Sequence, residues 1–300
     1  MDMTQNKCCR HGASLRRRRR RRRKILRSII FSCSIIAVAV FVTVGSSMIR
    51  SGDGRTNKYD VEARNNTYDN AVIENSKISE KNKIQNNQSM LDDIMNSTQY
   101  PKQLKDLALK NEEALEFVYD YPAEHVKEHT IDLTEEASMD SVPLFVQWDK
   151  RWGYEKYSGN FFAASGCGPT TLSMVVVYLT HNREASPIAV AKYSKEAGYS
   201  VDGSGSSWTL ISEGCMHYGV KAKSVALDES RMKAELDEGH PIVVNVGPGD
   251  FTDTGHFMVI TGYDDEGFSI NDPNSIEKSG KRWLFKNISS QIRAVWSMYV

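Results

Sequence analysis

The sequence predicts an α+β domain in the C-terminal half of the chain, preceded by one transmembrane helix. Two observations predict the domain: helical patterns fill residues 169–238, and short β-branched runs separated by glycine-containing turns fill residues 241–300. Helices followed by strands favour an antiparallel sheet with helices packed against it. A third observation, an uncharged apolar run over residues 28–49, predicts the membrane helix.

The N-terminal region has the pattern of a membrane anchor. Residues 1–27 form a basic tail with eight consecutive arginines, and residues 28–49 would extend roughly 33 Å as a helix, enough to cross a bilayer. Positive charge on the N-terminal flank predicts a single-pass protein of the cell membrane, with a cytoplasmic N-terminus and an extracellular C-terminal domain. The alternative is a cleaved signal peptide, which would have a shorter apolar core and a clear small-x-small site.

The net charge of zero averages two unlike parts of the chain. Of 38 basic and 38 acidic side chains, residues 1–50 hold 13 basic and one acidic, so the remainder is acidic by 12 charges. An arginine run alone would indicate nucleic-acid binding. Beside an apolar span it indicates membrane orientation instead, so we expect contact with the membrane through one helix and no nucleic-acid partner.

Two segments separate the predicted anchor from the domain. Residues 50–98 are rich in Asn, Ser, Lys, Asp and Glu without a sustained apolar period, which predicts a disordered polar spacer. Residues 99–140 carry apolar side chains at helical spacing and predict a helical lead-in that packs on the domain. A pro-region that blocks the cleft is the alternative interpretation of this second segment.

The domain begins at residue 141 with a short extended entry and continues into helices. Residues 169–180 are apolar on most sides, so they predict a buried central helix. Ser186 can cap the next helix, because serine accepts a hydrogen bond from a free backbone N–H group. Glycine ends each of the three further helices, which cover residues 187–197, 208–218 and 230–238.

The last 60 residues have the pattern of strands. Apolar runs at residues 241–246, 256–263 and 268–271 predict three strands, and residues 283–285 and 294–300 can add edge strands. The turn at residues 264–267 predicts that the second and third strands pair as a hairpin. The start of the second strand and the end of the third would then lie at the same end of that hairpin.

Cys167 has the sequence context of a reactive thiol. In Ser-Gly-Cys-Gly-Pro-Thr-Thr it precedes the central helix, where free N–H groups and the helix dipole favour thiolate over thiol. The flanking glycines would let a substrate backbone approach the sulfur. One alternative is a small buried cysteine in a turn. Another is a disulfide with Cys215, since only these two of the five cysteines fall in the predicted external part.

Three other residues can complete a nucleophilic site. His256 opens a strand after Gly255 and can serve as the base, and Asp272 can orient its ring from the same end of the hairpin. Gln147 and the Cys167 backbone N–H can donate to a developing oxyanion. The alternatives are a structural histidine, an Asx-Pro turn cap at Asp272 and a surface glutamine.

These motifs, in this order, carry a resemblance to a known family. Gln147, Ser-Gly-Cys-Gly-Pro-Thr-Thr, Gly-His-Phe-Met-Val-Ile-Thr-Gly-Tyr-Asp and Ile-Asn-Asp-Pro-Asn resemble the papain-like cysteine peptidases related to the bacteriocin-leader-processing peptidases, family 39. The resemblance covers residues 141–300. It implies a papain-like fold and cleavage of peptide bonds, with Cys167 as nucleophile, His256 as base, Asp272 as orienting residue and Gln147 in the oxyanion hole.

We therefore expect an extracytoplasmic thiol peptidase that acts on a peptide or protein, including cell-wall peptides, and uses no cofactor and no metal. An amidase or transpeptidase on the same scaffold and a non-catalytic wall-binding or peptide-binding module are the alternatives. A metal site built from Cys167, Cys215, His217 and His256 is disfavoured, because residues two apart on a helix point away from each other.

Overall fold

A computed structural model describes residues 58–300, with side chains from residue 77 onward. Residues 78–300 form one compact unit. The predicted basic tail and transmembrane helix, residues 1–27 and 28–49, lie outside the described residues. Within residues 58–300, no helix combines the length and apolar character needed to span a bilayer.

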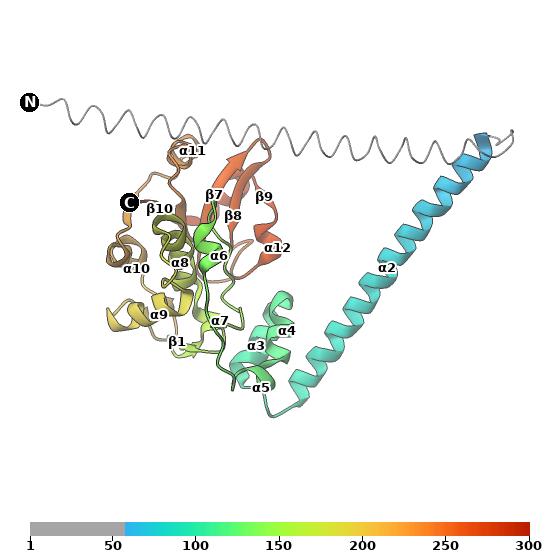
Figure 1. Cartoon of the computed structure of the whole chain (residues 1–300), viewed down its shortest axis with the longest axis horizontal. Helices are drawn as coiled ribbons and strands as arrows, with labels where there is room; N and C mark the ends of the chain where they lie inside the picture. Colours follow the sequence, from blue (N-terminus) through green and yellow to red (C-terminus); the bar gives the residue numbers. More distant parts are fainter. Residues whose placement is uncertain (1–57) are drawn as a thin grey trace, which may run out of the picture. The chain divides into compact units, whose positions relative to one another are not determined.

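Helix α2 replaces most of the predicted disordered spacer. Residues 50–98 were expected to lack structure, but Lys58–Asn96 forms one helix of 39 residues (Figure 1). An α-helix satisfies its backbone hydrogen bonds internally, so it can form from a polar sequence that has no apolar stripe. Where its side chains are described, α2 is mostly exposed until its last two turns, which bury Ile94 and partly bury Met90 and Leu91.

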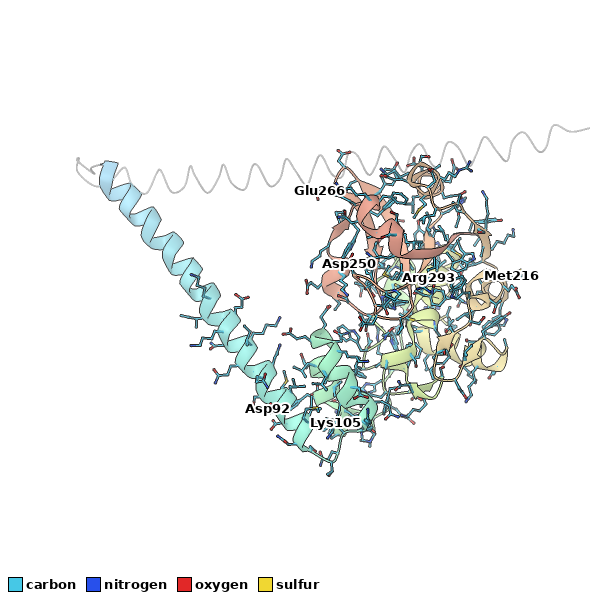
Figure 2. The ribbon with its side chains drawn as sticks, turned by 180° about the vertical axis from the view of Figure 1, so that it is seen from behind. Asp92, Lys105, Met216, Asp250, Glu266 and Arg293 are labelled. Atoms are coloured by element: carbon cyan, nitrogen blue, oxygen red, sulfur yellow. The ribbon has the colours of Figure 1, made fainter. Side chains whose placement is uncertain are left out.

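The region from residue 99 to residue 140 is built from short helices. These are α3 (Lys102–Lys110), the 3₁₀ helix η2 (Glu112–Ala114), α4 (Leu115–Tyr119), α5 (Tyr121–Glu124) and α6 (Thr134–Ser138). The apolar side chains of α3, η2 and α4 pack with the end of α2 and with Phe161 and Ala163 of the following domain, whereas Ala137 of α6 belongs to a separate core cluster. At the corner between α2 and α3, Lys105 Nζ donates a hydrogen bond to the Met95 carbonyl at 2.9 Å (Figure 2).

The helices of the domain follow the predicted order, with a short additional helix before the central one and one predicted helix divided in two. They are α7 (Phe162–Ser165), α8 (Cys167–Thr180), α9 (Pro187–Glu196), α10 (Thr209–Ser212), the 3₁₀ helix η3 (Gly214–Tyr218) and α11 (Glu229–Asp237). The Ser186 side chain caps α9 by accepting from the Ala189 N–H. The single helix expected over residues 208–218 is two short helices, because Glu213 between them leaves the helical conformation with φ −128°.

The sheet has six antiparallel strands in the order β5-β10-β6-β7-β8-β9. They are β5 (Lys221–Ser224), β6 (Ile242–Val246), β7 (His256–Asp264), β8 (Gly267–Asn271), β9 (Arg282–Trp283) and β10 (Ile292–Tyr299). Two strand pairs lie outside it: β1 (Lys156–Tyr157) with β2 (Asn160–Phe161), and β3 (Ser200–Val201) with β4 (Gly205–Ser206). Short helices α12 (Ile276–Ser279), α13 (Phe285–Ile288) and η4 (Ser289–Gln291) complete the chain.

The prediction of an edge strand over residues 294–300 was wrong. Strand β10 lies inside the sheet, because β5 pairs with its outer side. Strand β5 was not predicted, because its Lys-Ala-Lys-Ser sequence is largely exposed and has no apolar run. An edge strand with lysines on it needs little apolar surface and gives a weak sequence signal.

Alternating side chains of the central strands build a core on each face of the sheet. On one face, Val243, Val259 and Trp296 pack in a common cluster with the buried side of α8. On the other face, Ile242, Val244 and Ile260 pack with Met232 of α11. The predicted α+β arrangement, a helical part packed on an antiparallel sheet, is confirmed.

Candidate active site

Cys167 is the first residue of α8, two residues before the predicted start of this helix, and its side chain is partly exposed. Burial by itself would raise the pKa of the thiol. Hydrogen bonding and charge attraction from His256 outweigh burial, with help from the backbone N–H groups of Phe257 and Gly168, and lower the pKa of Cys167 below its ordinary value. The contacts with His256 and these two N–H groups therefore favour the thiolate, the nucleophilic form.

The glycines beside Cys167 are required by protein packing. A Cβ atom at Gly166 would meet the Phe162 ring at 2.6 Å, and one at Gly168 would meet Ser206 Oγ at 2.6 Å. Both glycines are buried. This corrects the prediction that the two glycines leave space for a substrate. The space is occupied by the side chains of Phe162 and Ser206.

His256 is the first residue of β7, and its ring is held by a buried carboxylate. Its Nε2 atom lies 2.7 Å from Asp272 Oδ1, with 6% of His256 and 0% of Asp272 exposed. Burial by itself would lower the pKa of His256. The charge and hydrogen bond of Asp272, together with Cys167, outweigh burial and raise the pKa above its ordinary value. This environment favours a thiolate paired with an imidazolium.

Asp272 follows β8, and the pairing of β7 with β8 brings it to His256. The register places Val259 opposite Asn271 and closes the hairpin at Asp264 and Gly267, as the turn pattern predicted. Asp272 Oδ1 also accepts a hydrogen bond from the Asn274 N–H at 2.8 Å. The same oxygen thus caps the turn and contacts the histidine, so both interpretations of Asp272 hold. Its other oxygen, Oδ2, is buried without a hydrogen-bond partner in the described part of the chain.

The neighbouring Asn271 turns away from the histidine. Its Nδ2 atom donates to the carbonyls of Val142 and Pro143 at 3.1 and 3.0 Å. This agrees with strand alternation, which places adjacent side chains on opposite faces. Asn271 is thereby occupied with holding the entry segment of the domain.

Gln147 is 4% exposed and lies between two segments of the site. Its Nε2 atom donates to the Ala163 carbonyl, four residues before Cys167, and its backbone N–H donates to the Pro273 carbonyl, both at 2.7 Å. An amide nitrogen has two hydrogens, so one remains for an oxyanion. The Oε1 atom is buried without a partner among residues 58–300. Buried polar atoms without partners are rare and often mark functional sites.

Cys215 has a different environment from Cys167. It is fully buried in the core cluster, and burial raises its pKa to about 11. Both cysteines are free thiols in the described structure. His217, two residues on, stacks on Tyr193 with ring centroids 4.0 Å apart. Across the described residues, no three or more His, Cys, Asp and Glu side chains form a group able to hold a metal ion.

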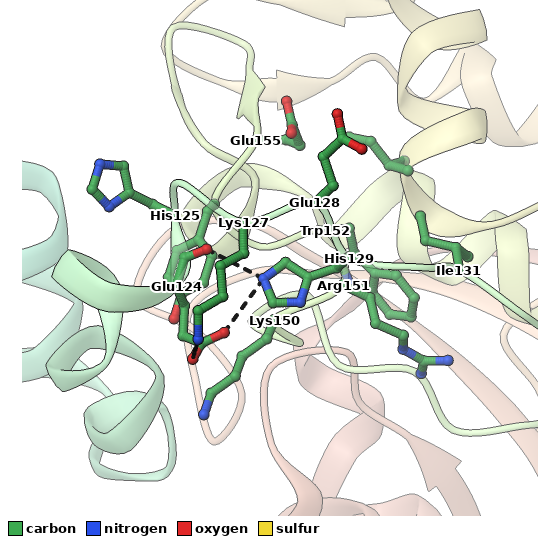
Figure 3. A pocket seen from close by; sticks show the side chains of 12 residues that line it. Glu124, His125, Lys127, Glu128, His129, Ile131, Lys150, Arg151, Trp152 and Glu155 are labelled. Carbon is green, nitrogen blue, oxygen red and sulfur yellow. Dashed lines mark hydrogen bonds and ion pairs between the residues drawn. The ribbon is translucent and has the colours of Figure 1, made fainter.

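A cavity with a volume of about 360 Å³ lies outside this cluster. Figure 3 shows its charged lining, in which Glu124 pairs with Lys127 at 2.7 Å and with His129 at 3.6 Å. None of Gln147, Cys167, His256 and Asp272 lines it. Since it contains no cysteine and its charges neutralise one another, we place the candidate site at the cluster around Cys167.

One comparison with known proteins identifies the family of the chain. The family model described as the Peptidase_C39 like family matches residues 139–300, and the chain belongs to this family. A comparison with curated proteins finds no match.

Two solved structures resemble part of the chain. The peptidase domain of Streptococcus ComA, a bifunctional ABC transporter involved in quorum sensing, is 19% identical, with coverage of 53% of this chain and 96% of that domain and a TM-score of 0.38. A protein described as a C39-like peptidase from Bacillus anthracis is 16% identical, with coverage of 53% and 95% and a TM-score of 0.34. Family membership rests on the family model, because these two scores are low.

Two residues outside the predicted set also contact the site. Asn111 lies just before η2 and Glu113 lies within it. Both side chains form hydrogen bonds with the turn that follows Asp272. They lie more than 160 residues from that turn along the chain. No local motif marks them, so their role could not be predicted from the sequence.

Proposed function

We propose that the protein is a thiol peptidase with Cys167 as nucleophile, His256 as general base and acid, Asp272 as the residue that orients His256, and Gln147 as an oxyanion donor. The observation that carries the proposal is the placement of the His256 ring between the buried Asp272 carboxylate and the Cys167 thiol at the start of α8. Membership in a peptidase-like family supports the same assignment.

The first half of the reaction forms an acyl-enzyme. The Cys167 thiolate attacks the carbonyl carbon of a peptide bond, and the carbonyl π electrons move to oxygen. The Cys167 backbone N–H and the free N–H of Gln147 Nε2 would donate to that oxyanion. His256 gives its proton to the departing amine as the C–N bond breaks, which leaves a thioester on Cys167.

The second half returns the free enzyme. Neutral His256 takes a proton from water, and the resulting hydroxide equivalent attacks the thioester carbonyl. The C–S bond breaks, the peptide acid leaves, and the thiolate–imidazolium pair is restored. Asp272 keeps one ring nitrogen of His256 occupied throughout, so that the other nitrogen faces the sulfur.

The direct test is peptide cleavage by the full chain and by two cysteine variants. Cys167→Ala should abolish cleavage of a peptide library, whereas Cys215→Ala should retain it, because Cys215 is buried in the core. Cleavage by the Cys167→Ala variant would remove the proposed nucleophile. Absence of cleavage by the wild-type chain, combined with tight peptide binding, would favour the non-catalytic module.

For location, we propose that residues 28–49 anchor the chain in the cell membrane and that residues 141–300 face outward. The support is the uncharged span beside eight arginines in the sequence. The intact mass of the membrane-bound protein should equal the full-length 33.8 kDa. A mass that corresponds to loss of the first 45–50 residues would show a cleaved signal peptide instead.

A further inference from the structure

We propose that Glu113 is a positioning residue for Asp272, and that the short helices around it are an integral part of the catalytic site. This inference rests on the proposed thiol peptidase function. Glu113 belongs to η2 and lies outside residues 139–300, the region that matches the family model. The structure thus assigns a role in catalysis to a segment added to the family domain.

The Glu113 carboxylate binds the start of α12. Its Oε2 atom accepts hydrogen bonds from the Ile276 and Glu277 backbone N–H groups at 2.7 and 3.0 Å. Its Oε1 atom accepts a hydrogen bond from Ser275 Oγ. The first backbone N–H groups of a helix have no partner within the helix, and a negative charge there is favourable. Glu113 therefore holds the start of α12 together with Ser275, whose side chain caps the helix by accepting from the Lys278 N–H.

Asn111 holds the same turn from the same segment. Its Nδ2 atom donates to the Asn274 carbonyl at 2.9 Å and to Asn274 Oδ1 at 3.1 Å. Its Oδ1 atom accepts from the Glu113 N–H at 3.0 Å, which caps η2. The two side chains therefore come from one rigid turn and contact consecutive residues after Asp272.

Hydrogen bonds join Asp272 to both ends of α12, at Ser275 just before its first residue and at Ser279, its last. The Asp272 backbone N–H donates to Ser279 Oγ at 2.9 Å, and the Ser275 N–H donates to the Asp272 carbonyl at 3.2 Å. The Asp272 carboxylate accepts from the Asn274 N–H and from His256. A shift of α12 would therefore move the carboxylate that orients His256, and with it the proton shared with Cys167.

This arrangement distinguishes an integral lead-in from a pro-region. A pro-region that blocks a cleft is removed to gain activity, whereas Glu113 and Asn111 bind the turn behind Asp272 and support it. We therefore expect loss of these contacts to lower activity. Displacement of atoms by about 1 Å in a catalytic site can cost on the order of 100-fold in rate, so a smaller shift should still be measurable.

The experiment compares Glu113→Ala with Glu112→Ala in the full chain. Glu112 is the matched control, because it has the same charge and the same short helix but accepts its hydrogen bond from Asn87 of α2. Iodoacetamide labelling of Cys167 is followed against pH by mass spectrometry, alongside turnover of a cleaved peptide. Glu113→Ala should shift the labelling midpoint upward and lower kcat about tenfold with little change in KM. Glu112→Ala should match the wild type.

Glu113→Gln keeps an acceptor oxygen for the α12 N–H groups and should recover part of the lost reactivity. It also replaces Glu113→Ala if that variant does not fold. A labelling profile and kcat equal to wild type in the Glu113 variants, even with a lower melting temperature, would overturn the inference and leave the proposed function intact. Wild-type Cys167 that labels only at alkaline pH would reject the proposed function itself.

Discussion

At the residue scale, the candidate chemistry depends on one imidazole with a different partner on each side. His256 is bonded to a carboxylate that is fully buried, while the thiol on its other side remains partly exposed. The buried partner can act only through His256, whereas the exposed partner can meet a substrate. This asymmetry gives the three residues unequal roles that substitutions can separate.

The first prediction follows from these unequal roles. His256→Ala should lower kcat by on the order of 10²–10⁴, because it removes the group that transfers the proton. Asp272→Ala should lower kcat less, because the imidazole remains and only its orientation is lost. Peptide turnover measured with each purified full-length variant checks this order, with circular dichroism to establish that both fold. Wild-type activity in the His256 variant would remove this residue from the mechanism.

Most of the candidate site could be predicted from the sequence, because each of these residues stands beside a recognisable helix or strand pattern. Cys167 begins an apolar helix, His256 begins a strand, and Asp272 directly follows the strand paired with it. The reason given for the glycines was wrong, because the space they leave is filled by side chains that only the fold brings near. Glu113 was missed for the same reason: its partners lie in a distant part of the chain.

At the element scale, strongly apolar elements were predictable and weakly apolar ones were not. The buried helix α8 and the central strands β6 and β7 have the continuous apolar runs that predict burial. The edge strand β5 has exposed lysines and was missed, which made β10 look like an edge. Helix α2 was taken for a disordered spacer, because a polar helix leaves no apolar period in the sequence.

The link between α11 and the sheet gives a prediction about acid stability. Glu235 of α11 contacts His240, Lys223 of β5 and Ser297 of β10, with distances of 3.1, 3.0 and 2.8 Å. The hydrogen bond to His240 is the largest of the influences that lower the pKa of Glu235, and together they lower it to about 2. Because the pKa of Glu235 is lower in the folded chain than in the unfolded chain, the charged carboxylate stabilises the fold at pH values above the unfolded pKa, near 4.5. This contribution is lost as the pH falls toward 2.

Glu235→Gln should therefore cost about 1 kcal/mol of unfolding free energy at pH 7, an amount reduced by solvent screening. The cost should shrink as pH falls below 4.5, because the wild-type carboxylate is then losing its advantage. Urea unfolding of both proteins at pH 7 and pH 3 measures the difference. Glu266→Gln, at the exposed turn labelled in Figure 2, is the control. An equal cost for Glu235→Gln at both pH values would contradict the assignment.

At the scale of the whole molecule, the candidate site is assembled from widely separated parts of unit 78–300. Gln147 comes from the entry segment, Cys167 from α8, His256 and Asp272 from the β7–β8 hairpin, and Glu113 from η2. The segment before residue 139 is thus bonded to the turn beside Asp272, in addition to packing on Phe161 and Ala163. We expect the site and this segment to respond together when the turn is disturbed.

The proposed chemistry depends most directly on the ionisation of the Cys167 thiol in the folded chain. The rate of iodoacetamide labelling at Cys167 measures this ionisation when it is followed by mass spectrometry between pH 5 and pH 9. Cys215 is the internal reference, because burial raises the pKa of the Cys215 thiol to about 11. We predict that Cys167 is labelled at pH values well below the ordinary thiol pKa of ~8.5, while Cys215 stays unmodified. Labelling of Cys167 only above pH ~8.5, or at the same pH as Cys215, would contradict it.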